Sequence, residues 1–208
     1  MGIVMFGLVV FMLGPVGLYI WYVAVHKPKA GRRAQETTWK PLAERIGGRF
    51  NVSDGVSRFH SVAVPYGQTL VTAIVFDRAA LDPAIANEVH GYEMGGWRTF
   101  VQASVPPGGG GSPAVISPGG GKTSLPIGDA AFQQQHSARV LRQTPLPVLA
   151  ARMTPQVCHA FSVLGGNYSS LVAGPSFVTL ELPGVCTDPA LIEAAIHVVG
   201  AFAQPSYA

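Results

Sequence analysis

Residues 167–203, NYSSLVAGPSFVTLELPGVCTDPALIEAAIHVVGAFA, decide the fold class. Two strand-like runs, 167–173 and 177–182, are separated by a turn that contains a Gly-Pro pair, which is typical of a β-hairpin. An Asp-Pro pair at 188 and 189 then begins a helix that we expect to end at about residue 203. Its apolar residues recur at helical spacing and predict one buried face: Leu191, Ile192, Ala195, Ile196, Val199 and Phe202. A strand pair followed by an amphipathic helix predicts an α+β domain with antiparallel strands and packing helices.

The sequence before this stretch continues the same alternation of short strands and helices. A helix is expected after a cap at Thr37 or Thr38, with Trp39, Leu42, Ala43 and Ile46 on one face and a glycine pair at its end. Strands are expected over 49–52, 59–64, 70–76 and 101–105, and a short helix over 82–86. Residues 129–141 are predicted to be extended, and helices are predicted over 145–153 and 156–164, the second capped by Thr154.

The stretch 106–121, PPGGGGSPAVISPGGG, is rich in glycine and proline and is therefore predicted to be a flexible loop. The run 114–116 within it fits a short hairpin strand. The predicted organisation is a transmembrane helix over 1–25, a basic juxtamembrane linker over 26–37 and one α+β domain over 38–208.

The transmembrane prediction depends on residues 3–25, IVMFGLVVFMLGPVGLYIWYVAV, which carry no charge. As a helix this run reaches about 35 Å, enough for a hydrocarbon core of about 30 Å. A secretory signal peptide is the alternative, but the charges follow the run and no small-residue cleavage site ends it. A retained membrane anchor is the favoured interpretation.

The residues around this run predict its orientation and packing. Basic residues follow the run and none precedes it, so the positive-inside rule predicts a single-pass protein of the inner (plasma) membrane with a cytoplasmic C-terminal domain. Aromatic residues and these basic residues are the expected interface anchors: Tyr19, Trp21, Tyr22, Lys27, Lys29, Arg32 and Arg33. Small residues around a helix-bending proline are the expected helix-packing positions: Gly7, Gly14, Pro15 and Gly17. A bend without any function is the alternative for Pro15.

The charge distribution argues against a nucleic-acid partner. The net charge is +3, but four of the fourteen basic residues lie before residue 34, which leaves ten against eleven acidic residues in the rest of the chain. No basic stripe with interleaved aromatic residues is present. Charged residues make up 12% of the chain, about half the usual share, so the domain surface is weakly protected against association. The two cysteines, Cys158 and Cys186, are expected to be reduced thiols in the cytoplasm.

Sequence patterns that suggest catalysis or ligand binding are incomplete. The run 119–123, GGGKT, resembles the end of a phosphate-binding loop, but residue 116 is isoleucine and a proline follows at 126, so no nucleotide is predicted. Cys158 and His159 are helix neighbours that point apart, and a buried thiol beside an exposed imidazole is expected. No metal, cofactor or catalytic residue is predicted. Polar residues of an exposed loop are the favoured interpretation of Glu88, His90 and Glu93, with a metal site as the alternative.

The chain resembles a loosely defined group of uncharacterised bacterial domains anchored by a single membrane span. The resemblance is carried by a W-x-x-L-A helix ended by glycines, a G-D-x-x-F turn and a D-P closing helix, matched here by Trp39, Leu42, Ala43, Gly47, Gly48, Gly128, Asp129, Phe132, Asp188 and Pro189. It implies the membrane anchor and the α+β domain, and no activity.

Two functional classes remain after these exclusions. The favoured hypothesis is a non-catalytic accessory or scaffold subunit whose partners are integral membrane proteins and the lipid bilayer. Energy-converting assemblies, photosynthetic or respiratory, are one class that holds such single-span subunits. The alternative is a membrane-anchored cytoplasmic enzyme or ligand-binding domain.

Overall fold

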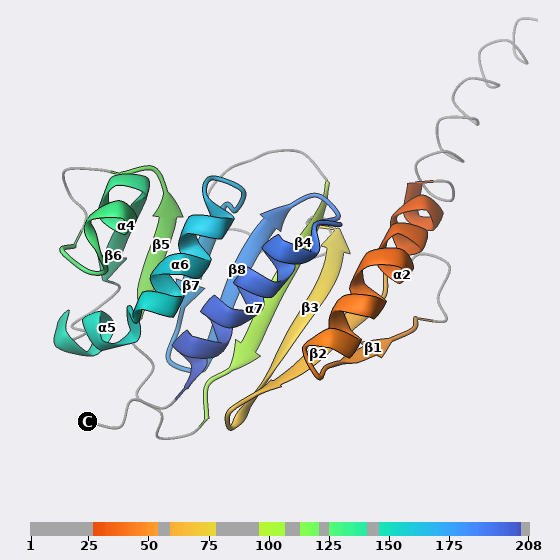
Figure 1. Ribbon diagram of the computed structural model, residues 1–208, viewed down its shortest axis with the longest axis horizontal. Coiled ribbons are helices and arrows are strands. Elements are labelled where there is room, and N and C mark those ends of the chain that lie inside the picture. The colour runs from red at the N-terminus through yellow and green to blue at the C-terminus, as the bar shows by residue number, and fades with distance from the viewer. Residues whose placement is uncertain are drawn as a thin grey trace, which may run out of the picture.

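The computed structural model describes residues 27–53, 59–77, 96–106, 113–120, 125–140 and 146–204. Helices and strands follow one another in the order α2 (Lys27–Arg45), β1 (Arg49–Asn51), β2 (Ser61–Tyr66), β3 (Thr69–Asp77), β4 (Trp97–Ser104), β5 (Ala114–Pro118), α4 (Ala130–Gln135), β6 (His136–Val140), α5 (Leu146–Arg152), α6 (Pro155–Leu164), β7 (Ser170–Ala173), β8 (Phe177–Pro183) and α7 (Pro189–Ala203). Figure 1 shows this arrangement.

The strands form one eight-stranded sheet in the order β1-β2-β3-β4-β8-β7-β5-β6. Every strand pair in it is antiparallel. The hairpin predicted around Gly174 and Pro175 is formed by β7 and β8, and β8 lies at the centre of the sheet, between β7 and β4. The predicted α+β class with an antiparallel sheet and packing helices is therefore confirmed.

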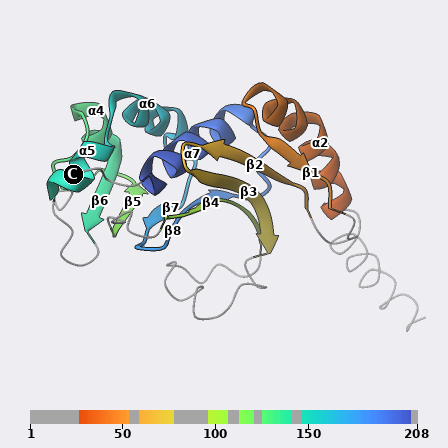
Figure 2. The ribbon, with the colours of Figure 1, turned by 90° about the horizontal axis from the view of Figure 1, so that it is seen from below.

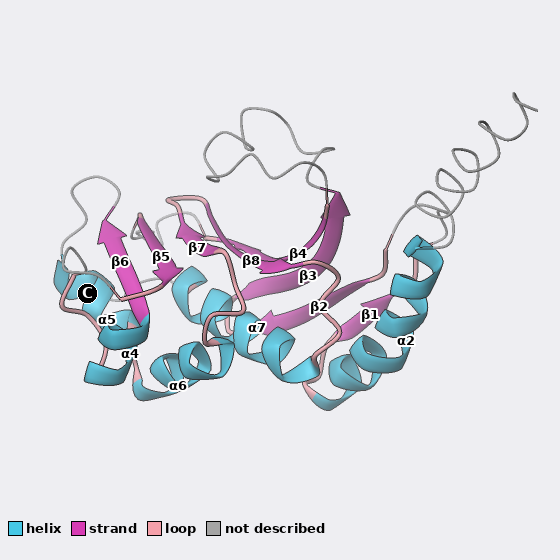
Figure 3. Ribbon diagram, turned by 90° about the horizontal axis from the view of Figure 1, so that it is seen from above, coloured by secondary structure: helices cyan, strands magenta, loops and turns pink. Residues whose placement is uncertain are grey.

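The five described helices lie on one side of the sheet, as Figures 2 and 3 show from opposite directions. Helix α7 packs on β3, β4 and β8, with α2 on one flank and α6 on the other. Asp188 caps α7 by accepting a hydrogen bond from the backbone N–H of Ala190, and Pro189 occupies the first turn. The predicted apolar face is buried, because Ile192, Ala195, Val199 and Phe202 are each at most 1% exposed.

Helix α2 begins at Lys27, about three turns before the predicted cap, so the segment expected to be a juxtamembrane linker is helical from Lys27 onward. The hydroxyl groups of Thr37 and Thr38 do not cap a helix. Both donate hydrogen bonds to the backbone carbonyl of Ala34, at 2.9 and 2.7 Å, which is the behaviour of threonines inside a helix. The predicted buried face is present, with Trp39, Leu42 and Ala43 in the core.

One prediction for the middle of the chain is wrong. Residues 130–135 form helix α4 where an extended segment was expected, because the Asp129 carboxylate accepts a hydrogen bond from the Phe132 N–H at 2.7 Å and starts a helical turn. The short strand expected over 114–116 within the glycine-rich stretch is present as β5, which pairs with both β6 and β7. The predicted helix over 82–86 lies outside the described residues.

Among the residues that the structure describes, no helix is both long and apolar enough to cross a membrane. The predicted membrane span, the helix-packing positions Gly7, Gly14, Pro15 and Gly17, and the anchors Tyr19, Trp21 and Tyr22 all lie outside the described residues.

Candidate functional site

The first candidate site is the start of α2, which carries the predicted basic anchors. Lys29 and Arg33 are exposed and four residues apart, so they share one side of the helix, and Arg32 is half-buried. Gly31, between them, lies against the Phe59 ring, and a Cβ at this position would be 2.5 Å from a ring carbon. The basic part of α2 is therefore in contact with the domain.

Gln35 attaches α2 to the sheet through its side-chain amide. Its Nε2 donates to the backbone carbonyl of His60 at 3.2 Å, and its Oε1 accepts from the backbone N–H of His60 at 2.9 Å. The Gln35 side chain is fully buried. Both halves of one amide thus bind the residue that precedes β2, which fixes the position of the helix along the strand.

The His60 ring adds to this attachment. Its Nδ1 accepts a hydrogen bond from the Ser53 N–H at 3.1 Å, which places the ring proton on Nε2, 3.1 Å from the Glu36 carboxylate on α2. Two turns of α2 further on, Arg45 forms an ion pair with Glu193 of α7. Helix α2 is therefore held at three points along its length, with the Trp39 side chain in the core between them.

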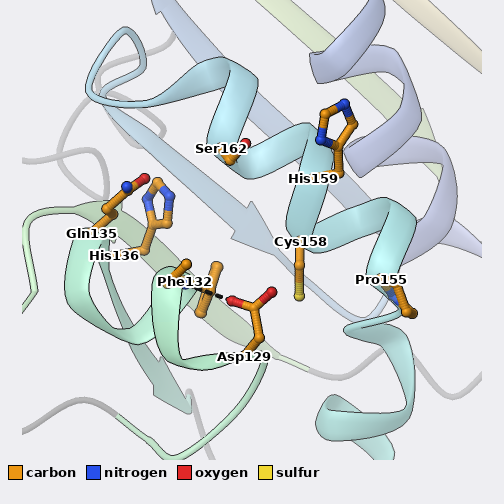
Figure 4. Close-up of a pocket in the computed structure, with 9 residues that line it drawn as sticks. Asp129, Phe132, Gln135, His136, Pro155, Cys158, His159 and Ser162 are labelled. Carbon is orange, nitrogen blue, oxygen red and sulfur yellow. Dashed lines mark hydrogen bonds between the residues drawn. The ribbon is translucent and has the colours of Figure 1, made fainter.

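The second candidate site is a pocket of about 220 Å³ between α4 and α6. Figure 4 shows side chains from both helices around it. The pocket is lined by Asp129, Ala131, Phe132, Gln135, His136, Pro155, Cys158, His159 and Ser162. Its polar residues lie mostly at the rim, because Gln135, His159 and Ser162 are exposed, whereas Phe132, His136 and Cys158 are buried.

The ionisable groups of this pocket do not form a nucleophile and base. Burial raises the pKa of the Cys158 thiol, and the thiol lies 3.8 Å from the Met153 carbonyl as its hydrogen-bond acceptor. Burial lowers the pKa of His136, whose Nδ1 is 2.9 Å from the Tyr168 hydroxyl. A protonated thiol and a neutral imidazole inside an aromatic cluster have the character of core residues. The expected burial of Cys158 and exposure of His159 are confirmed.

The described residues hold no group of three or more potential metal ligands. The alternative metal ligands Glu88, His90 and Glu93, and the Lys122-Thr123 pair of the apparent phosphate loop, lie outside the residues that the structure describes. Both cysteines are buried, free thiols.

The third candidate site is the side of the sheet that carries no described helix, which we name the open face. Three large apolar residues on it are exposed: Leu70, Phe76 and Phe177. Sequence reasoning did not identify this surface, because strand alternation alone does not show which face the helices cover.

Two polar pairings in the structure were also missed. Arg152 of α5 donates from Nη1 to the backbone carbonyls of Ala201, Phe202 and Gln204 at the end of α7. On the open face, Arg98 Nε and Glu181 Oε1 form an ion pair at 3.3 Å, and Glu181 is 2% exposed. The sequence feature that could have indicated the Arg98–Glu181 pair is that each of these residues is the one charged residue of its strand, β4 and β8 respectively.

Comparisons with known proteins leave the family of the chain open. No protein-family model matches the chain, and no curated protein is similar to it. Among solved structures, the chain is similar to the crystal structure of the mycobacterial trehalose monomycolate transport factor A, TtfA, with 12% sequence identity and a TM-score of 0.41 over 83% of this chain and 91% of that chain. A likeness at this TM-score gives no support for a function. The resemblance to membrane-anchored bacterial domains stays a prediction.

Proposed function

We propose that this protein is a non-catalytic accessory subunit that binds integral membrane proteins through an N-terminal span and through its α+β domain. In this proposal residues 3–25 cross the inner membrane, the basic residues of α2 lie at its cytoplasmic surface, and the domain lies in the cytoplasm. Energy-converting complexes, photosynthetic or respiratory, are one class of assembly that holds such subunits.

The observation that supports this role is the direct attachment of α2 to the domain core. Gln35 and Trp39 are fully buried, and both follow the basic residues within the same helix. A subunit with two docking surfaces benefits when the relative orientation of the two surfaces is fixed in advance. Pre-organisation lowers the entropy lost on binding, and linked contacts raise the effective concentration of the second contact.

The experiment is gentle solubilisation of native membranes followed by native electrophoresis. We expect the protein to comigrate with a larger assembly. Replacement of Gly14 by Leu enlarges the surface of the predicted span and should weaken comigration without preventing membrane insertion. Val9→Leu, a similar change away from the small residues, is the matched control. Migration as a free monomer under the mildest conditions would contradict the proposal.

The orientation has its own test. A C-terminal reporter that is active only outside the cytoplasm should stay silent in the proposed topology. An active reporter would place the domain on the other side of the membrane, where Cys158 and Cys186 would meet oxidising conditions.

The alternative of an anchored enzyme or ligand-binding domain is favoured by one observation, the pocket between α4 and α6. We expect Cys158→Ala, His159→Ala and His90→Ala, made singly, to leave the biological role intact apart from modest losses of stability. A large functional loss in a stably folded variant would support the alternative.

A further inference from the structure

The start of helix α2 carries two basic side chains that the domain does not pair. Lys29 and Arg33 are exposed, and neither has an ion pair or a side-chain hydrogen bond with another described residue. Residues 27–36 contain one acidic residue, Glu36, and its carboxylate lies 3.1 Å from His60 Nε2. The first turns of α2 therefore present positive charge that the described part of the domain leaves available for a partner.

The two cations lie close together and close to the start of the helix. Because they are four residues apart, they are neighbours on one side of α2. At the helical rise they lie about 3 and 9 Å along the axis from Lys27. Helical side chains lean toward the N-terminus of their helix, so both cations lean toward the uncharged run over 3–25. The headgroup layer on each side of a bilayer is about 5–8 Å thick, so both side chains reach it in the proposed topology.

The start of α2 has a fixed position because it packs on the domain. Gly31, between the two cations, lies against the Phe59 ring, and that ring makes an edge contact with Trp97 at a centroid distance of 4.6 Å. One turn further on, Gln35 holds the helix through its two hydrogen bonds to the His60 backbone. Figure 1 shows the start of α2 at the end of the molecule where β3 ends and β4 begins. Cations held in place lose less entropy on binding than cations on a flexible linker.

The composition of this surface fits a lipid headgroup better than a protein. Exposed side chains on this side of α2 are polar or charged: Lys29, Arg33, Glu36, Thr37 and Lys40. None of the large exposed apolar residues in the described ranges is on α2. Protein interfaces have an apolar core that is depleted in lysine and glutamate, whereas an anionic headgroup needs only positive charge and hydrogen-bond donors.

We propose that Lys29 and Arg33 bind the phosphate groups of anionic phospholipids and hold this end of the domain against the cytoplasmic surface of the membrane. The inference rests on the membrane anchoring in the proposed function, and it names the lipid class that contacts α2. Both side chains donate hydrogen bonds to lipid phosphate oxygens. The net negative charge of the lipid, which phosphatidylcholine lacks, supplies the selectivity.

The test is native mass spectrometry of the full chain, released from a nonionic detergent that contains equal amounts of phosphatidylglycerol and phosphatidylcholine. The measured quantity is the ratio of bound phosphatidylglycerol to bound phosphatidylcholine. We expect a ratio of about ten at low salt, since each cation near the headgroups adds to the attraction. The ratio should fall as the concentration of ammonium acetate is raised, because salt screens this attraction.

Matched variants locate the binding along α2. Lys29→Gln and Lys40→Gln are the same substitution on the same side of the helix, but Lys40 lies about 16 Å further along the axis, beyond the headgroup layer. Lys29→Gln and Arg33→Gln should each lower the lipid ratio about threefold, and the double variant should bring it close to one. Lys40→Gln should leave the ratio unchanged. Far-UV circular dichroism verifies that each variant is folded.

Four outcomes overturn the inference. Two of them are equal binding of the two lipids and a preference for phosphatidylglycerol that the Lys29 and Arg33 variants leave unchanged. The third is displacement of phosphatidylglycerol by millimolar glycerol phosphate, which would indicate a site for a soluble anion. The fourth is displacement by a micromolar polyglutamate peptide, which would indicate a site for an acidic protein segment.

This inference and the proposed function fail separately. Comigration of the native protein with an assembly, without a preference for phosphatidylglycerol, leaves the accessory role in place and removes only the lipid contact. A monomeric native protein that prefers phosphatidylglycerol through Lys29 and Arg33 contradicts the accessory role and leaves the lipid contact in place.

Discussion

The indole Nε1 of Trp39 donates a hydrogen bond to the backbone carbonyl of Cys186 at 2.8 Å. Trp39 is on α2, and Cys186 lies in the connection from β8 to α7. The bond therefore joins the first described helix to the segment between the central strand and the last helix. Trp39 is also fully buried, so this contact combines apolar burial with a satisfied polar group.

Removal of this hydrogen bond should destabilise the domain. Trp39→Phe retains most of the aromatic bulk and leaves the Cys186 carbonyl without its indole donor, which should lower the free energy of unfolding by about 1–3 kcal/mol. Trp39→Ala also creates a cavity and should cost about 3–5 kcal/mol. Urea unfolding followed by far-UV circular dichroism measures both, with Lys40→Ala as an exposed control. A Trp39→Phe variant as stable as the control would show that the bond contributes nothing.

A tight contact between β2 and α7 gives a second prediction. A Cβ on Gly200 would be 2.4 Å from the Tyr66 ring, so Gly200→Ala should destabilise the domain by about 1–3 kcal/mol. Helix propensity alone would predict a gain of up to about 1 kcal/mol from the same change.

The double variant separates these two effects. Tyr66→Ala removes the ring, and in that background Gly200→Ala should be neutral or stabilising, which a double-mutant cycle of unfolding free energies measures. If Gly200→Ala is equally harmful with and without the Tyr66 ring, the close approach is not the cause.

The features that sequence predicted well are those with a strong local pattern. The strand over Thr69–Asp77 and the helix over Pro189–Ala203 were expected within one residue at each end, because the first is a continuous apolar run and the second has a cap and a clear helical period. Helix α4 was missed because it has six residues and only Phe132 is buried, which is too short for a periodic pattern.

The features that sequence could not predict depend on distant partners. The first half of α2 has no apolar period, and it is held by contacts of Gly31 with Phe59 and of Gln35 with His60. Strand β5 was expected over 114–116 as part of a short hairpin, but its pairing with β7, which comes much later in the chain, depends on the rest of the sheet. The positions of Arg49 and Arg139 on the two edge strands also depend on the strand order, which the local sequence does not show.

The end of α7 depends on one buried cation. Arg152 donates to the carbonyl groups of Ala201, Phe202 and Gln204 at 2.7–3.0 Å, where a helix C-terminus leaves its carbonyls without partners. Arg152→Met keeps an unbranched side chain but removes these hydrogen bonds. The substitution should lower the free energy of unfolding by about 2–4 kcal/mol. In the variant, amide hydrogen exchange should be faster than in the original protein in the last turn of α7, with a smaller change in β8. Unchanged protection there would contradict the capping role; Arg139→Met, at an exposed position, is the control.

Two histidines should make the stability of the domain depend on pH. Burial lowers the pKa of His136, with the Phe161 backbone opposing it, and burial lowers the pKa of His197, with Glu193 opposing it. Each group therefore binds a proton more tightly in the unfolded chain than in the folded one. The contribution of these two neutral histidines to the free energy of unfolding is fully present above the ordinary histidine pKa of 6.5. It is lost as the pH falls below that value toward the lowered pKa of the folded state.

The measurement is the urea midpoint between pH 7.5 and pH 5. His136→Gln retains an acceptor for the Tyr168 hydroxyl and should flatten part of the decline below pH 6.5, and His197→Gln should flatten a further part. His159→Gln, at an exposed position on α6, is the matched control and should leave the pH profile unchanged. A profile that declines as steeply in the His136→Gln and His197→Gln double variant as in the original chain would assign the acid sensitivity to other groups.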